Sequence, residues 1–258
     1  VNPLQKEALA ALGNIVFYPS VDQLLNSNTG FDVLSIATPN GFHEEHAVKG
    51  LEAGKHILVE KPLALTKEAC KSIIEASVKH RKHVFCVMQN RYSPAAIWLK
   101  EILQEKILGK IFIVEVSCFW NRDERYYTQG SWHGTRQLDG GTLFTQFSHF
   151  IDMVLWLFGD ITNISGRFAN FNHTGLTAFE DSGLIHFDFI NGGTGSFNYS
   201  TSCRGKNMES SMTIIAENGS VKVGGQYMEE VEYCDVKDYT LPELPENCGL
   251  SKPPAANH

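Results

Sequence analysis

Hydrophobic and polar positions follow two different patterns along this chain, and the first covers residues 31–88. Short apolar runs rich in β-branched residues predict strands there, and the amphipathic segments between them predict helices. In chain order the predicted elements cover 31–38 (strand), 42–54 (helix), 56–60 (strand), 66–80 (helix) and 83–88 (strand). Thr66 is the predicted N-cap of the second helix. Strands separated by helices of this length favour a parallel sheet covered by helices.

The second pattern begins near Gly109 and consists of strands separated by turn signals such as Asn218-Gly219. A predicted helix at 93–107 precedes this pattern, and a strongly apolar helix at 142–158 interrupts it. The predicted strands of this half cover 110–120, 161–170, 183–190, 194–201, 210–216 and 219–223. The second half therefore predicts an α/β domain with a mainly antiparallel sheet.

The change of pattern indicates two domains, which we place at residues 1–92 and 93–258. Ahead of the first parallel strand we expect a helix at 3–13 and a strand at 14–18. The predicted fold class is α/β.

Composition narrows the class of protein. The formal net charge is −7 and the pI about 5.8, and an acidic balance argues against a nucleic-acid partner. No apolar run reaches the length of a membrane span, so we expect no membrane partner. The cysteines form no C-x-x-C pair and the run 43–46 lacks the H-E-x-x-H spacing, so we expect no metal site. Scattered single cysteines favour a reducing compartment, and we expect a cytoplasmic protein.

Each strand of the predicted parallel sheet ends in polar residues. Ligands of such sheets bind beyond the carboxyl ends of the strands. A polar strand end also occurs wherever a strand reaches water, so one alone is ambiguous, whereas three in succession favour a site. In chain order these residues are Thr38, Pro39, Asn40 and His43, then Glu60 and Lys61, then Gln89, Arg91 and Tyr92.

Lys61 is the candidate for proton transfer at these strand ends. Pro62 restricts the preceding residue to an extended backbone, which holds the lysine in one direction. Apolar neighbours make an ammonium easier to deprotonate, and this suits chemistry near neutral pH. The alternative is a surface lysine that precedes a turn.

The predicted helix 142–158 carries the second candidate site. It is apolar on most sides, which is typical of a buried helix. One face nevertheless carries Thr145, His149 and Asp152. A buried histidine near a carboxylate is often only a satisfied core pair. The alternative is a general base whose tautomer Asp152 helps to fix.

Several motifs, in this order, resemble the Gfo/Idh/MocA family of NAD(P)-dependent sugar and polyol oxidoreductases. They are "ATPNGFH" (37–43), "GKHILVEKPLA" (54–64), "QNRYSP" (89–94), "SWHGT" (131–135) and "DGGTLFTQFSHFIDMVLW" (139–156). The resemblance implies a Rossmann domain followed by an α/β domain with a large, mainly antiparallel sheet. It also implies NAD or NADP as cofactor, a sugar or nucleotide-sugar substrate, and a homo-oligomer, either a dimer or a tetramer.

The same resemblance assigns roles to individual residues. It implies that Lys61 and His149 are catalytic. The implied cofactor-binding residues are Thr38, Pro39, Asn40, His43, Glu60, Lys61, Gln89 and Trp132. The implied substrate-binding residues are Lys61, Arg91, Tyr92, His133, Thr145, His149 and Asp152.

The chain departs from the family pattern at Thr145, at Phe147, which replaces a common glycine, and at both ends, where we expect the family's sequence to be incomplete. Thr145 stands where many members carry an aspartate, which puts in doubt a mechanism that needs a third acidic group. A non-acidic residue there is similar to the branch that acts on nucleotide-activated sugars, such as UDP-N-acetylglucosaminuronate 3-dehydrogenases. The family's first strand and G-x-G-x-x-G loop do not appear, so we expect an incomplete Rossmann domain that lacks roughly 30 residues ahead of Val1.

Two other functions remain open at this stage. One is a family member that uses bound NAD for net non-redox chemistry. The other is a catalytically inactive sugar-sensing or scaffolding relative. Thr145 and the absent glycine loop favour the inactive relative, whereas the presence of both Lys61 and His149 favours an enzyme.

Overall fold

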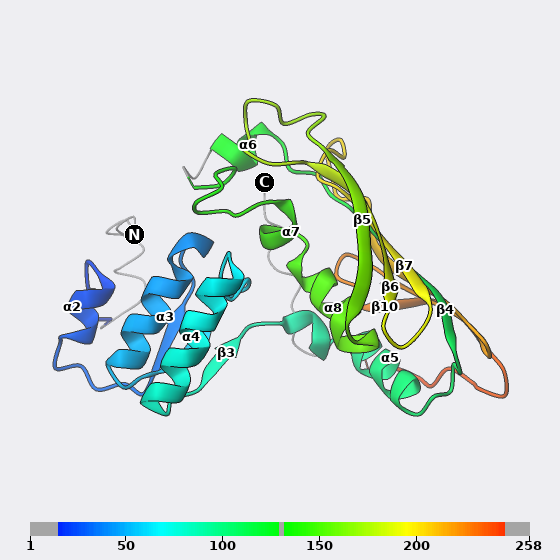
Figure 1. Ribbon diagram of the computed structural model, residues 1–258, viewed down its shortest axis with the longest axis horizontal. Helices are drawn as coiled ribbons and strands as arrows, with labels where there is room; N and C mark the ends of the chain where they lie inside the picture. Colours follow the sequence, from blue (N-terminus) through cyan, green and yellow to red (C-terminus); the bar gives the residue numbers. More distant parts are fainter. Residues whose placement is uncertain (1–14, 129–131, 246–258) are drawn as a thin grey trace. The chain divides into compact units, whose positions relative to one another are not determined.

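The computed structural model describes residues 15–128 and 132–245, and it divides the chain into two compact units (Figure 1). The first unit is Val1–Val87 and the second is Met88–His258. Residues 88–92, which the sequence-based division gave to the first domain, group here with the second unit. The helix expected at 3–13 lies outside the described residues.

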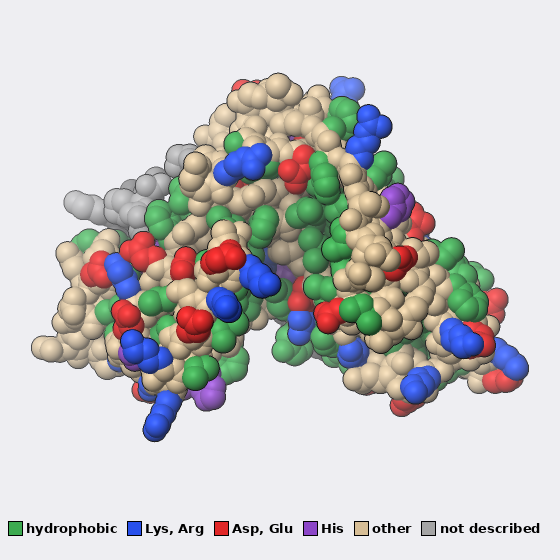
Figure 2. All heavy atoms as spheres, viewed as in Figure 1, with side chains coloured by type: hydrophobic (Ala, Val, Ile, Leu, Met, Phe, Trp, Pro, Cys, Tyr) green, Lys and Arg blue, Asp and Glu red, His purple; other side chains and the backbone are tan. Residues whose placement is uncertain are grey.

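The first unit is built on a parallel sheet, as predicted, and its strand order is β1-β2-β3. Leu34 and Ile36 are buried and alternate with exposed neighbours on β1, so one face of that strand packs into a core. The described elements are α2 (Val21–Leu25), β1 (Val33–Ile36), η1 (Asn40–Phe42), α3 (His43–Glu52), β2 (His56–Val59), α4 (Lys67–His80) and β3 (Val84–Cys86). Charged side chains of both signs are interspersed on the face of this unit that Figure 2 shows.

The predicted start of α4 is confirmed. The hydroxyl of Thr66 accepts a hydrogen bond from the backbone N–H of Ala69 at 3.0 Å. Arg81 ends the helix in the left-handed conformation, with φ of 53°.

The strand expected at 14–18 is wrong for residues 15–18, which form no regular element. A strand requires a neighbour to accept and donate its backbone hydrogen bonds. The described parallel sheet ends at β1, and no described strand pairs with these residues.

The second unit contains a sheet with the strand order β10-β9-β8-β4-β7-β6-β5. Only β4 and β7 pair in parallel within this described sheet, so the prediction of a mainly antiparallel sheet is confirmed. Its strands are β4 (Ile111–Phe119), β5 (Ile161–Ala169), β6 (Ser182–Phe189), β7 (Thr194–Ser200), β8 (Glu209–Ala216), β9 (Gly219–Gly224) and β10 (Glu230–Val236). Its helices are η2 (Gln89–Tyr92), α5 (Pro94–Gln104), α6 (Glu124–Thr128), α7 (Thr142–Thr145) and α8 (Ser148–Phe158). The sequence pattern did not predict α6 or β10.

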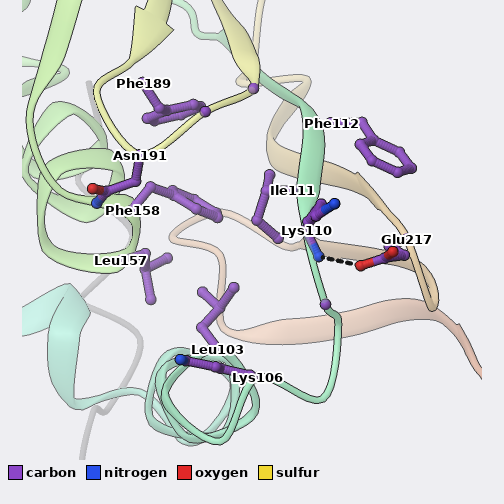
Figure 3. Close-up of a pocket in the computed structure, with 13 residues that line it drawn as sticks. Leu103, Lys106, Lys110, Ile111, Phe112, Leu157, Phe158, Phe189, Asn191 and Glu217 are labelled. Atoms are coloured by element: carbon purple, nitrogen blue, oxygen red, sulfur yellow. Dashed lines mark hydrogen bonds between the residues drawn. The ribbon is translucent and has the colours of Figure 1, made fainter.

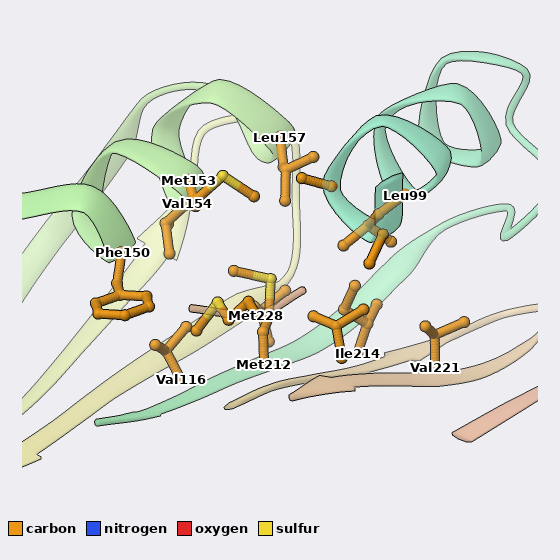
Figure 4. Close-up of a cluster of buried hydrophobic side chains, with 14 of the residues drawn as sticks. Leu99, Val116, Phe150, Met153, Val154, Leu157, Met212, Ile214, Val221 and Met228 are labelled. Atoms are coloured by element: carbon orange, nitrogen blue, oxygen red, sulfur yellow. The ribbon is translucent and has the colours of Figure 1, made fainter. Parts of the chain in front are cut away.

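The hydrophobic core of the second unit lies between one face of the sheet and the helices α5 and α8 (Figure 4). Val116 on β4 and Ile214 on β8 contribute from the sheet. Leu99 on α5 and Met153 on α8 contribute from the helices. This packing fixes α8 against the middle of the sheet and therefore positions every side chain that the helix carries.

The continuous helix expected over 142–158 is wrong, because the structure divides it into α7 and α8. The break falls at Gln146 and Phe147. Phe147 is fully buried, with its ring centroid 5.2 Å from that of Trp120. We attribute the break to two contacts that a straight helix would not allow together. Phe147 packs against Trp120, and Gln146 accepts a hydrogen bond from Arg122.

None of the helices in the described ranges is long and apolar enough to cross a membrane. The cysteines within these ranges, which are Cys70, Cys86, Cys118, Cys203 and Cys234, form no disulfide.

Ile73 and Ile74 are neighbours on α4 and provide a matched test of its orientation. Ile73 is 0% exposed and Ile74 is 56% exposed. We expect Ile73→Ala to lower the free energy of unfolding by about 2–5 kcal/mol, because the substitution leaves a cavity in the core. The control Ile74→Ala should change it by only about 0.5 kcal/mol. Urea denaturation followed by circular dichroism measures both, and equal losses would contradict the placement of α4.

Candidate active site

The polar residues after β1 and β2 belong to two loops that His43 holds together. Its ring nitrogens lie 2.7 Å from the carbonyl oxygen of Pro62 and 2.9 Å from that of Thr38. His43 is buried at the start of α3, so this ring is part of the packed unit. The Thr38 hydroxyl also lies 3.2 Å from Nδ1 of His46. The first unit therefore fixes the backbone on both sides of its candidate residues.

Lys61 lies two residues beyond the end of β2 and is joined to Pro62 by a cis peptide bond. Its side chain is half-buried, whereas Glu60 is exposed. Asn40, in the loop after β1, is buried. The contact between the His43 ring and the carbonyl oxygen of Pro62 holds the backbone immediately after Lys61 in place.

In the second unit, Arg91 on η2 binds Asp152 on α8. Arg91 Nε donates to Asp152 Oδ2 at 2.7 Å, and Nη2 donates to the other carboxylate oxygen. The guanidinium carbon also lies 5.7 Å from the ring centroid of Trp156. The described partner of the Asp152 carboxylate is thus Arg91, so the suggestion that Asp152 orients His149 gains no support from these contacts.

His149 lies in the first turn of α8 and is buried. Four residues earlier, the Thr145 hydroxyl donates to the carboxylate of Asp139. That carboxylate is buried and also accepts the backbone N–H of Gly134 at 2.7 Å. An acidic group therefore does accompany Thr145, although it comes from position 139 and not from position 145.

A polar and aromatic network lies beside the α7–α8 break. Arg122 Nε donates to Gln146 Oε1 at 2.7 Å, and Gln146 Nε2 donates to the Tyr126 hydroxyl at 2.6 Å. The Tyr126 ring stacks on His133, with their centroids 4.3 Å apart. His133 in turn meets the ring of Trp132 at 3.8 Å. The predicted residues Trp132 and His133 are thereby connected to the segment that precedes His149.

Burial governs the ionisation of this network. It raises the pKa of Tyr126, to which the charge of Asp139 adds, and it raises the pKa of Tyr127 to about 12. Both phenols therefore remain protonated at neutral pH. Burial also lowers the pKa of the Arg122 guanidinium, although not enough to neutralise an arginine.

Sequence reasoning missed Arg122, Tyr126, Asp139 and Gln146. The signal for Arg122 was available, because it closely follows a predicted strand, as the other candidate residues do. Asp139 belongs to the quoted D-G-G run, but nothing in the spacing indicated that its carboxylate would bind Thr145.

A separate cavity of about 870 Å³ lies elsewhere in the second unit (Figure 3). Apolar side chains such as Leu103, Leu157 and Phe189 line it, with Lys106 and Lys110 beside them. Leu157 is eight residues beyond His149, which is roughly 12 Å along the helix axis. The cavity is therefore at the opposite end of α8 from the candidate site.

Family models match both units of the chain. Residues 1–88 match the model described as the oxidoreductase family with an NAD-binding Rossmann fold. Residues 97–222 match the GFO/IDH/MocA C-terminal domain. The fold and these matches define an NAD-binding oxidoreductase class. The chain belongs to the GFO/IDH/MocA oxidoreductase family.

Solved structures with the same fold include two WlbA dehydrogenases, each in complex with NADH and UDP-GlcNAcA. The Chromobacterium violaceum protein is 33% identical with a TM-score of 0.84, and the match covers 91% of this chain and 67% of that one. The Bordetella pertussis protein is 29% identical with a TM-score of 0.84, covering 92% and 67%.

A curated relative is the levoglucosan dehydrogenase of Pseudarthrobacter phenanthrenivorans. It is 28% identical over 258 residues, which cover 86% of this chain and 65% of that protein. The chain thus spans about two thirds of the length of these similar proteins.

The residues present fit a polar ligand such as a dinucleotide. Gln89 opens η2 in the second unit, and its buried Oε1 makes no hydrogen bond among the described residues. Buried polar atoms are nearly always paired, so such an atom indicates a missing partner. Separately, the first unit carries hydroxyl, amide and carboxylate groups at Thr38, Asn40 and Glu60. No group of three or more His, Cys, Asp or Glu residues in the described part of the chain is arranged to hold a metal ion.

The Asp139–Thr145 contact generates a stability prediction. Thr145→Val keeps the side-chain shape but leaves a buried carboxylate with one donor fewer. We expect the free energy of unfolding to fall by about 1–3 kcal/mol. The control is Thr213→Val on β8, where the side chain is half-buried and a β-branched residue suits the strand. Chemical denaturation measures both, and an unchanged stability of the Thr145 variant would show that the contact contributes nothing.

Proposed function

We propose that this chain acts in a dehydrogenase that transfers a hydride between a hydroxyl-bearing carbon of a sugar or nucleotide sugar and NAD or NADP. The observation that carries the proposal is the match of both units to the oxidoreductase family, with Lys61 and His149 both present. The similarity to the WlbA dehydrogenases in complex with NADH and UDP-GlcNAcA supports a nucleotide sugar as the substrate class.

The bound nicotinamide would accept the hydride, which leaves binding, orientation and proton transfer to the protein. When the C–H bond of the substrate's carbinol carbon breaks, the hydroxyl on that carbon must give its proton to a base as the carbonyl forms. We assign this proton to His149 or Lys61, with Lys61 also holding the substrate oxygen. A positioned base of this kind contributes about 10²–10⁴-fold to the rate.

The family resemblance divides the remaining predicted residues by role. Thr38, Pro39, Asn40, His43, Glu60, Gln89 and Trp132 are proposed to hold the cofactor. Arg91, Tyr92, His133, Thr145 and Asp152 are proposed to face the substrate. The buried Asp139–Thr145 pair removes one argument for an inactive relative, because a carboxylate is present beside Thr145. We also propose a cytoplasmic location, because the cysteines are scattered singly along the sequence.

We also propose that the protein is a homo-oligomer, a dimer or a tetramer. None of the described helices covers the sheet face opposite α5 and α8, where Ile113, Leu184 and Ile215 are exposed. Exposed apolar side chains on one face favour association with a second copy.

We expect Leu184→Glu to lower the molar mass measured by light scattering, and a monomeric unmodified protein would contradict the proposal.

Replacing Lys61 tests the proposed chemistry. Lys61→Met keeps the aliphatic stem but removes the amine, so we expect kcat with UDP-GlcNAcA to fall by about 10²–10⁴-fold. The dissociation constant for NADH, measured by fluorescence titration, should change far less. The control is Lys67→Met in the first turn of α4, where the side chain is exposed. An unchanged kcat in the Lys61 variant would reject its catalytic role.

A further inference from the structure

Arg122 is a half-buried cation whose described partners are all neutral. Its Nε donates to Gln146 Oε1 at 2.7 Å. Its Nη1 donates to the carbonyl of Asn121 at 2.6 Å and lies 3.4 Å from Oδ1 of Asn207. The guanidinium carbon lies 4.9 Å from the ring centroid of Trp120 and 5.2 Å from that of Tyr126. No hydrogen bond from Nη2 occurs among the described residues, although this nitrogen carries two N–H donors.

The charge of Arg122 is not balanced by a carboxylate in direct contact. Two other arginines of the described ranges, Arg91 and Arg125, each bind an aspartate, whereas the ion pairs seen in those ranges do not include Arg122. Asp139 and Arg122 both influence the pKa of Tyr126, in opposite directions. The Asp139 carboxylate is already bonded to Gly134 and Thr145. Withdrawing a charge from water without a partner is costly, so an anion supplied by a ligand would be favourable here.

The position of Arg122 connects it to the candidate site. Gln146, which accepts from Arg122, lies three residues before His149 at the α7–α8 break. Tyr126, against which the guanidinium packs, stacks on His133. All of these residues belong to the second unit. An anion on the guanidinium would therefore be near residues that we propose to face the substrate.

We propose that Arg122 is a substrate-binding residue that receives an oxyanion of the substrate, either the carboxylate of a uronic sugar or the diphosphate of a nucleotide sugar. This inference rests on the proposed function and narrows its substrate class to anionic sugars. Guanidinium suits both groups because its planar N–H donors match two oxygens at once. The rings of Trp120 and Tyr126 hold the guanidinium in place without neutralising it.

Ligand titrations distinguish the two sources of the oxyanion. The probes are UDP for the diphosphate, glucuronate for the carboxylate, and glucose as an uncharged sugar. Each is titrated against the protein with bound NADH, and quenching of tryptophan fluorescence reports binding because Trp120 contacts Arg122. We expect Arg122→Met to weaken the binding of UDP, of glucuronate or of both by roughly 10- to 100-fold, and to leave glucose binding unchanged. Loss for UDP alone assigns the diphosphate, and loss for glucuronate alone assigns the carboxylate.

The matched control is Arg125→Met, three residues further along the chain. Arg125 is exposed and bound to Asp123, so this variant also removes one positive charge but should leave all three affinities unchanged. Arg122→Lys keeps the positive charge but loses the planar guanidinium group, and we expect it to retain part of the affinity for anions. Thermal unfolding checks that each variant is folded. If Arg122→Met is unfolded, Arg122→Lys tests the proposal instead, and it should lose affinity for the anions but not for glucose.

Three results would overturn the proposal. The first is an equal loss of affinity for glucose and for the anions, which would indicate a structural role for Arg122. The second is an equal effect of the Arg125 variant, which would indicate general electrostatics. The third is failure of the unmodified protein to bind either anion. Anion binding through Arg122 without any dehydrogenase activity would instead refute the proposed function alone.

Discussion

The packing of Trp120 against the α7–α8 break is the interaction on which the site in the second unit depends. Its ring meets Phe147 at 5.2 Å and Phe150 at 5.7 Å, and its indole N–H donates to the hydroxyl of Ser210 at 2.8 Å. A buried indole of this size contributes a large apolar surface and also needs a hydrogen-bond partner, and both conditions are met here. The end of β4 is thereby fixed against the helices. Arg122 and Gln146 meet because this contact determines where their backbones lie.

The polar groups of the site are stabilised in pairs, so few of them move independently. Asp139 accepts from Gly134 and Thr145, and Arg91 binds Asp152 in a two-pronged contact. A carboxylate withdrawn from water without such donors would be destabilising, and each of these two, the buried Asp139 and the half-buried Asp152, accepts at least two hydrogen bonds. These contacts hold the loop after Trp132 and the start of α8 in one arrangement. Preorganisation of this kind is what a site needs if binding energy is to be used for orientation.

The sequence predicted the elements and their order better than it predicted side-chain partners. Thr66 and the apolar run before Lys61 are local signals, because a helix cap and a strand depend mainly on neighbouring residues. The break at Phe147 was missed because it follows from packing against Trp120, which is distant in the sequence. The Asp139–Thr145 contact was missed for a related reason. Helical periodicity placed Thr145 on the face of His149 but could not show that a loop residue returns to bind it.

The overall charge gives the cationic residues of the site a specific importance. A chain with a net charge of −7 repels anionic ligands at long range, and salt reduces this repulsion beyond about 8–10 Å. Dinucleotides and the proposed nucleotide-sugar substrates are both anions, so binding them would require local groups that outweigh the average field. Arg91 is already neutralised by Asp152, whereas Arg122 packs among neutral groups and aromatic rings. On an acidic surface, a cation without a bound carboxylate therefore favours only those anions that can reach that cation and pair with it. Such selectivity distinguishes a specific anion site from general electrostatic attraction.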